Sequence, residues 1–164
     1  TYFITFTTYG TWVHGDERGS VDRRQNGFGE PLVGSEYALR TYRSTLMTEP
    51  PFTMNAECRE IVLAAIRQHA EFRGWNLVAA HVRSSHVHLV VAANVEPETV
   101  MTQFKARASR ASNAGAARKR WTRHGSTRHL SSEESIRRAV HYTVAEQGQA
   151  MALYVCEEFQ ECGL

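Results

Sequence analysis

The chain has 164 residues, of which 42% are hydrophobic and 22% charged, a balance typical of a globular domain in water. This length fits a single domain, residues 1–164, and excludes a (β/α)8 barrel, which needs roughly 200 residues or more. The net charge is only +2. No apolar run approaches the roughly 20 residues that cross a bilayer, and the start has no signal-peptide pattern, so we expect a cytoplasmic protein with reduced cysteines.

The N-terminal third contains one clear element. Residues 2–9, "YFITFTTY", are β-branched and aromatic, and they predict a strand. Glycines and charged residues then predict a loop that runs to about residue 35. A short helix is expected over residues 36–47, where "EPP" ends it.

The middle of the chain predicts a helix followed by a hairpin. Apolar residues recur at helical spacing after Asn55, a plausible N-cap, and the pattern stops at Gly74. Residues 75–82, "WNLVAAHV", and 86–93, "HVHLVVAA", predict two strands. Only a few residues separate them, which indicates a β-hairpin.

The last third predicts two more helices. The first covers residues 96–114 with Pro97 in its first turn. A strand and turn, or a loop, follows over residues 121–130. The next helix covers residues 131–148, where Ser131 and Glu134 form a capping-box pattern and Gly148 is the expected stop. The tail, residues 149–164, is expected to be partly helical.

This order of elements predicts an α+β fold. Four strands with helices between them fit a ferredoxin-like sandwich, in which an antiparallel sheet carries helices on one face. The other face would then be free for a functional site.

Positive charge is concentrated in residues 99–132. This stretch contains no Asp or Glu, and its eight cations are Lys105, Arg107, Arg110, Arg118, Lys119, Arg120, Arg123 and Arg128. Such asymmetry favours a polyanionic partner, although a solvated helical face is the alternative. The candidate DNA contacts are Arg83, Lys105, Arg120, Arg123 and Arg128. At Arg83 a plain hairpin turn is an equally good interpretation.

Two histidines stand at the start of the second hairpin strand, in "RSSHVHLVV". Because side chains alternate along a strand, His86 and His88 share one face while Val87 points to the other. Two imidazoles on one face can bind a metal ion. Taken alone, however, this pattern is more often an ordinary polar strand face.

The last predicted helix offers partners for the histidines. Tyr142 and Glu146 are four residues apart, so they lie about 40° apart on one helix face. Gln147 competes with Glu146 as a third metal ligand, but it lies about 140° round from Tyr142, toward the apolar stripe. The stripe consists of Ile136, Val140 and Val144. On this geometry Glu146 is the preferred ligand.

Two histidines, a tyrosine, a carboxylate and a basic stretch suit attack of a tyrosine on a DNA phosphodiester. With these motifs the sequence resembles the HUH endonucleases, and more closely the IS200-like single-tyrosine transposases, especially the REP-associated tyrosine transposase branch. The resemblance rests on "FTTYGTW", "RSSHVHLVV" and "YTVAEQG". His86 and His88 match the motif histidines and Tyr142 matches the nucleophile. Glu146 stands where the family usually has Gln or Asn.

The resemblance implies a ferredoxin-like fold, a divalent metal (Mg²⁺ or Mn²⁺) and action on single-stranded DNA near a hairpin. The chain would nick and rejoin DNA through a 5′-phosphotyrosine intermediate, as a monomer or a homodimer. An HUH replication initiator or relaxase-type nickase is the nearest alternative. A domesticated relative that binds hairpins without cleaving them is the alternative from another class. Cupins are disfavoured because the next acid, Glu96, lies eight residues after His88.

Overall fold

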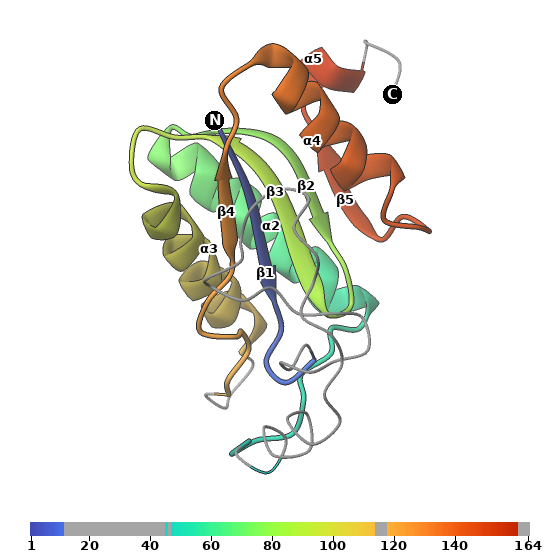
Figure 1. Cartoon of the computed structure of the whole chain (residues 1–164). Helices are drawn as coiled ribbons and strands as arrows, with labels where there is room; N and C mark the ends of the chain where they lie inside the picture. Colours follow the sequence, from blue (N-terminus) through green and yellow to red (C-terminus); the bar gives the residue numbers. More distant parts are fainter. Residues whose placement is uncertain (12–44, 46, 114–117, 161–164) are drawn as a thin grey trace.

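The computed structural model describes residues 1–11, 45, 47–113 and 118–160. Five antiparallel strands form one sheet in the order β4-β1-β3-β2-β5. The strands are β1 (Tyr2–Thr7), β2 (Asn76–Val82), β3 (His86–Ala92), β4 (Ser126–His129) and β5 (Ala152–Val155). The helices are α2 (Ala56–Arg73), α3 (Pro97–Ser112), α4 (Glu133–Ala145) and α5 (Glu157–Gln160) (Figure 1).

The first four strands confirm the predicted ferredoxin-like arrangement. Their order, β4-β1-β3-β2, results from two interlocked strand–helix–strand units with α2 and α3 as the crossover helices. The fifth strand was not predicted. β5 has only four residues, and it is a strand because its backbone pairs with the edge of β2. The helix expected in the tail is confirmed only for α5.

Local signals explain the middle of the chain. The Asn55 side chain accepts a hydrogen bond from the Cys58 N–H at 2.8 Å and starts α2. Gly74 ends the helix with a φ of 65°, a left-handed conformation that glycine adopts without strain. The β2–β3 hairpin follows as predicted.

Helices cover both faces of the sheet, and the two faces have separate cores. α2 and α3 pack on the face formed by alternate residues of β1 and β3, as predicted. This core includes Ile4, Phe6, Val87, Leu89, Val91, Ile66 and Phe104. α4 packs against β2 and β3 on the opposite face, so that face is not free of helices, in contrast to the prediction (Figure 1). This second core includes Val78, Ala79, Val90, Leu130, Ala139 and Val140.

Helix α4 differs from its predicted bounds at both ends. The capping box is formed by Ser132 and Ser135, not by Ser131 and Glu134, because the extended backbone of Ser132 aims its side chain at the Ser135 N–H. At the other end the helix stops at Ala145, three residues before Gly148. The chain has therefore left the helix when it reaches Glu146, which is the C-cap residue.

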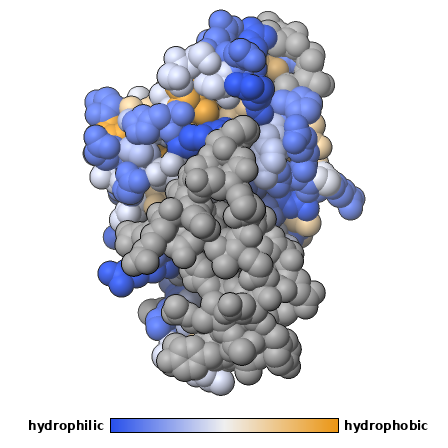
Figure 2. Space-filling view, in the orientation of Figure 1, coloured by the Kyte–Doolittle hydropathy of each residue, from blue (hydrophilic) through white to orange (hydrophobic). Residues whose placement is uncertain are grey.

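Several predictions fall outside the described residues. These are the loop before residue 35, most of the helix expected over residues 36–47, and Cys162. Cys58 and Cys156 are free thiols. No described helix is long and apolar enough to span a bilayer. In Figure 2 the described surface on the viewed side is mainly hydrophilic, with small separate hydrophobic areas.

Candidate active site

The two histidines lie side by side on the face of the sheet against which α4 packs. Val87, between them, is fully buried in the opposite core. The rings of His86 and His88 are 4.8 Å apart between centroids. In the neighbouring strand β1, His86 pairs with Thr7 and His88 with Thr5. Strand alternation thus places both imidazoles at one point, as predicted.

His88 is held firmly in place by β1. Its Nδ1 lies 2.8 Å from the Thr5 Oγ1, and its ring stacks on Phe3 with 5.6 Å between centroids. Only 6% of the residue is exposed. Because Thr5 occupies Nδ1, the other ring nitrogen, Nε2, is the one left to face a ligand.

The environment keeps His88 neutral. Burial is the main cause that lowers its pKa to about 3, and the nearby positive charge of His86 adds to the effect. A side-chain hydrogen bond with Gln147 acts in the opposite direction. A neutral imidazole is the form that binds a metal ion, so His88 needs no deprotonation at physiological pH.

The lowered pKa of His88 predicts acid sensitivity in metal-free protein. Between an ordinary value of 6.5 and about 3, the unfolded chain binds a proton that the folded chain excludes. The free energy of unfolding is therefore fully retained above pH 6.5 and falls as the pH drops, by up to about 1.4 kcal/mol per pH unit.

We expect His88→Gln to reduce this loss between about pH 7 and pH 5, a range in which most carboxylates stay ionised. Urea unfolding at several pH values in the presence of a chelator measures the free energy of unfolding of both proteins. The same pH slope in wild type and variant would contradict the assignment.

Tyr142 stands beside the histidines. It projects from α4 with its ring edge-on to His88, at 5.5 Å, and to Phe3, at 5.8 Å. The residue is 41% exposed, unusual for a large aromatic side chain at the edge of a core. One side of the ring is thus fixed by packing, while the residue stays accessible to a substrate.

The structure separates the two candidate third ligands. Glu146 turns away from the sheet, and its Oε1 lies 2.9 Å from the Nδ1 of His141. Gln147 lies beside His88, where its side chain acts to raise the pKa of that histidine, and its Nε2 donates to the Tyr142 carbonyl at 3.2 Å. The described residues contain no cluster of three histidine, cysteine or carboxylate side chains suited to a metal ion.

The end of α4 at Ala145 explains this arrangement. The predicted angles around the helix, about 40° from Tyr142 to Glu146 and about 140° from Tyr142 to Gln147, assumed a helix that continues through Gln147. Since the backbone leaves the helix at Glu146, the next residue is redirected toward the sheet. The structure therefore brings Gln147, and not Glu146, to the histidine pair.

Three of the five predicted DNA contacts bond to the chain's own backbone. Arg83 donates to the Gln149 carbonyl at 3.0 Å, and Arg120 donates to the Ser112 carbonyl at 3.0 Å. Lys105 donates to two carbonyls, and burial lowers its pKa to about 8. The two carbonyls belong to Thr122 and His124. These three cations thus join neighbouring segments of the chain's own backbone.

The other two cations lie on exposed parts of the segment that contains β4. Arg123 is exposed. Arg128 is exposed too, and its guanidinium lies 5.4 Å from the centre of the Phe3 ring. Phe3 also stacks on His88, so Arg128 stands one ring away from the histidine pair. This position suits contact with a phosphate close to the reacting one.

Phe3 is the main site residue that sequence reasoning missed. It contacts His88, Tyr142 and Arg128. The alternation of "YFITFT" contained the signal, because Ile4 and Phe6 are core residues and Phe3 must face the other way.

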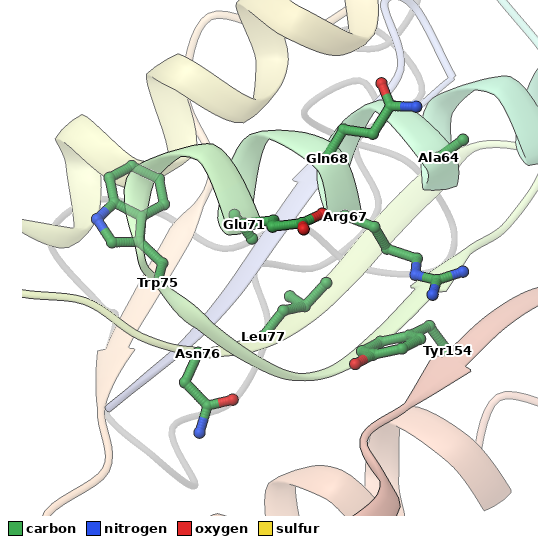
Figure 3. A pocket seen from close by; sticks show the side chains of 9 residues that line it. Ala64, Arg67, Gln68, Glu71, Trp75, Asn76, Leu77 and Tyr154 are labelled. Carbon is green, nitrogen blue, oxygen red and sulfur yellow. The ribbon is translucent and has the colours of Figure 1, made fainter.

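A pocket of about 490 Å³ lies elsewhere, between α2 and strands β2 and β5 (Figure 3). Arg67 lies over the Tyr154 ring there, 4.5 Å from its centre. Neither histidine of the pair nor Tyr142 lines it. The candidate chemistry is therefore on the α4 side of the sheet and not in this pocket.

A ferredoxin-like domain whose paired histidines meet a tyrosine from a late helix has the arrangement of the HUH class. Sequence comparison is more specific: residues 42–134, more than half of the chain, match the family described as "Transposase IS200 like". The chain belongs to this family. The matched region contains His86 and His88 and ends before Tyr142.

A solved structure described as a REP-associated tyrosine transposase bound to a REP hairpin is 13% identical, with a TM-score of 0.48. The similarity covers 87% of this chain and 62% of that one, so this chain spans less than two thirds of the other's length. No curated protein matches the chain.

Proposed function

We propose that this protein is a metal-dependent transposase that nicks and rejoins single-stranded DNA beside a hairpin through Tyr142. One observation carries the proposal: Tyr142, the single large exposed aromatic residue of α4, lies against the histidine pair in a chain of the IS200-like family. The hairpin substrate is taken from the family resemblance.

The proposed reaction is a transfer of one phosphodiester bond. The Tyr142 Oη attacks the phosphorus and loses its proton to solvent, while the bond from phosphorus to the 3′ oxygen breaks and that oxygen gains a proton. The products are a 5′-phosphotyrosine link and a free 3′-hydroxyl. Attack by a 3′-hydroxyl on the phosphotyrosine reverses the transfer and joins strands without ATP.

The residues around Tyr142 fit a divalent cation. His86, His88 and Gln147 would hold it, since they offer two imidazoles and an amide that meet on one sheet face. When bound, a cation such as Mg²⁺ or Mn²⁺ withdraws charge from a non-bridging phosphate oxygen. The chain itself contributes orientation: Thr5 and Phe3 fix His88, and Phe3 and His88 fix the Tyr142 ring.

The proposal is tested with labelled hairpin oligonucleotides in Mn²⁺. Wild-type protein should form a covalent adduct that survives denaturing electrophoresis and disappears with a chelator. Hairpin binding without an adduct, across a library of flanking sequences, would favour the non-catalytic hairpin binder.

The position of Gln147 predicts its role as the third ligand. We expect Gln147→Ala to reduce metal-dependent cleavage about 10- to 100-fold and to weaken Mn²⁺ binding, because it removes a group beside His88. Glu146→Ala is the matched control and should have a smaller effect, since Glu146 bonds to His141. A larger loss in Glu146→Ala would restore the carboxylate as ligand. Titration calorimetry with Mn²⁺ gives the measurement.

The position of Arg128 predicts a phosphate contact. We expect Arg128→Ala to weaken hairpin binding and to reduce the slope of log affinity against log salt by about 1. Arg67→Ala, on the opposite side of the sheet, is the matched control and should leave the slope unchanged. Fluorescence anisotropy at several salt concentrations measures both. Equal slopes in wild type and Arg128→Ala would exclude the contact.

A further inference from the structure

A third histidine lies next to the pair, on strand β2. His81 pairs with His88 across the hairpin, yet it is completely buried. Its Nδ1 lies 2.8 Å from the Thr143 carbonyl oxygen, and its Nε2 lies 3.1 Å from the Met151 N–H. Both ring nitrogens are therefore used within the chain.

These two bonds fix the protonation of His81. A carbonyl oxygen only accepts, so Nδ1 carries the hydrogen; a backbone N–H only donates, so Nε2 offers its lone pair. The neutral Nδ1–H tautomer is the one form that makes both bonds. With both nitrogens engaged, His81 is not available to a metal ion.

The two partners of His81 stand at the two ends of one segment, residues 143–151, which contains Gln147. Thr143 follows Tyr142 directly in α4, and Met151 directly precedes β5. Between them the chain leaves the helix, and Gln147 turns toward His88. Arg83, directly after the end of β2, donates to the Gln149 carbonyl in the same segment.

We propose that His81 is a positioning residue that fixes the tyrosine helix and the segment 143–151 on the sheet. This inference rests on the proposed function of Tyr142. His81 touches neither the phosphate nor the cation in this role. It sets the position of Tyr142 through its bond to the next residue's carbonyl, and that of Gln147 by holding both ends of its segment.

The physical reason is that His81 is the hydrogen-bond partner of two backbone groups, the Thr143 carbonyl and the Met151 N–H. Thr143 is completely buried, so its carbonyl would lose its partner if the imidazole were removed. The segment would then shift to find other partners, and a displacement of about 1 Å at a reacting group can reduce a rate about 100-fold.

A second buried histidine provides the matched control. His69, on α2, is as deeply buried as His88, and its Nε2 lies 2.9 Å from the Gln103 Oε1. It packs in the core on the far side of the sheet, among Trp75 and Phe104. His69→Phe removes a buried imidazole without touching the tyrosine segment.

The first experiment separates the rate of reaction from DNA binding. In His81→Phe the rate of adduct formation at saturating hairpin should fall about 10- to 100-fold, while the hairpin Kd stays within about twofold. His81→Gln keeps one donor and one acceptor, so it should recover part of the rate. His69→Phe should stay near the wild-type rate. Equal rates in His81→Phe and His69→Phe would overturn the inference.

The second experiment needs no catalysis. In wild type the Met151 amide should exchange slowly with deuterium, and a ¹⁵N NMR spectrum of the imidazole should show the neutral Nδ1–H tautomer. His81→Phe should speed exchange at Met151, whereas His69→Phe should not. Fast wild-type exchange or an Nε2–H tautomer would overturn the inference, even if His81→Phe does not fold.

The two experiments together distinguish two kinds of failure. If wild type forms no adduct with any oligonucleotide, the proposed function fails, and the exchange data still show whether His81 holds the segment. If wild type forms the adduct and His81→Phe matches it in rate and exchange, the positioning role fails alone.

Discussion

Tyr142→Phe should abolish the covalent adduct with hairpin DNA while leaving hairpin binding intact. The substitution removes one oxygen, the atom that we propose bonds to phosphorus, and keeps the ring that packs on Phe3 and His88. Loss of a nucleophile commonly costs on the order of 10⁴-fold or more in rate, so no adduct should be detectable.

Tyr154→Phe is the control for this experiment. Tyr154 lies on β5 under Arg67, in the pocket behind the sheet, and its substitution should leave adduct formation unchanged. Mass spectrometry of the trapped peptide identifies the modified residue directly. An adduct that persists in Tyr142→Phe, or a trapped peptide without Tyr142, would show that another residue is the nucleophile.

Replacement of His88 by alanine should have the second largest effect. We expect adduct formation to fall at least about 100-fold. Mutation of residues that only hydrogen-bond to a metal ligand already reduces metal affinity or activity about 10- to 100-fold, and His88 is a proposed ligand itself. His86→Ala should act similarly, since both rings meet at one point. Adduct yield as a function of Mn²⁺ concentration measures the loss, and excess metal should recover part of it.

His129→Ala is the control for the histidine pair. His129 is an exposed histidine at the end of β4, where it contacts Tyr2. Its substitution should leave the metal dependence unchanged. If His88→Ala keeps the wild-type response to Mn²⁺, the histidines are not the metal ligands, and the proposed chemistry must be assigned to other groups.

The sheet and the histidine pair could be predicted because both depend on local patterns. Alternation in "HVHLVV" decides which residues face the core, and caps at Asn55 and Gly74 decide where α2 begins and ends. These signals require no knowledge of the rest of the fold.

The details around Tyr142 depend on tertiary contacts and were harder to predict. Gln147 reaches His88 because α4 ends at Ala145, and the sequence shows a clear stop only at Gly148. Strand β5 forms because the β2 edge is available for pairing. Similarly, long cations such as Lys105 and Arg120 contribute positive charge to the segment, but nothing in their spacing indicates that they bond to nearby carbonyls.

Strand β5 has a consequence for self-association. It covers the edge of β2, so the two border strands of the described sheet are β5 and β4, each of only four residues. Short border strands offer few unpaired backbone groups, and charged side chains such as Arg128 on β4 oppose the approach of another strand. Strand β5, which directly follows segment 143–151, thereby protects the sheet from edge-to-edge aggregation.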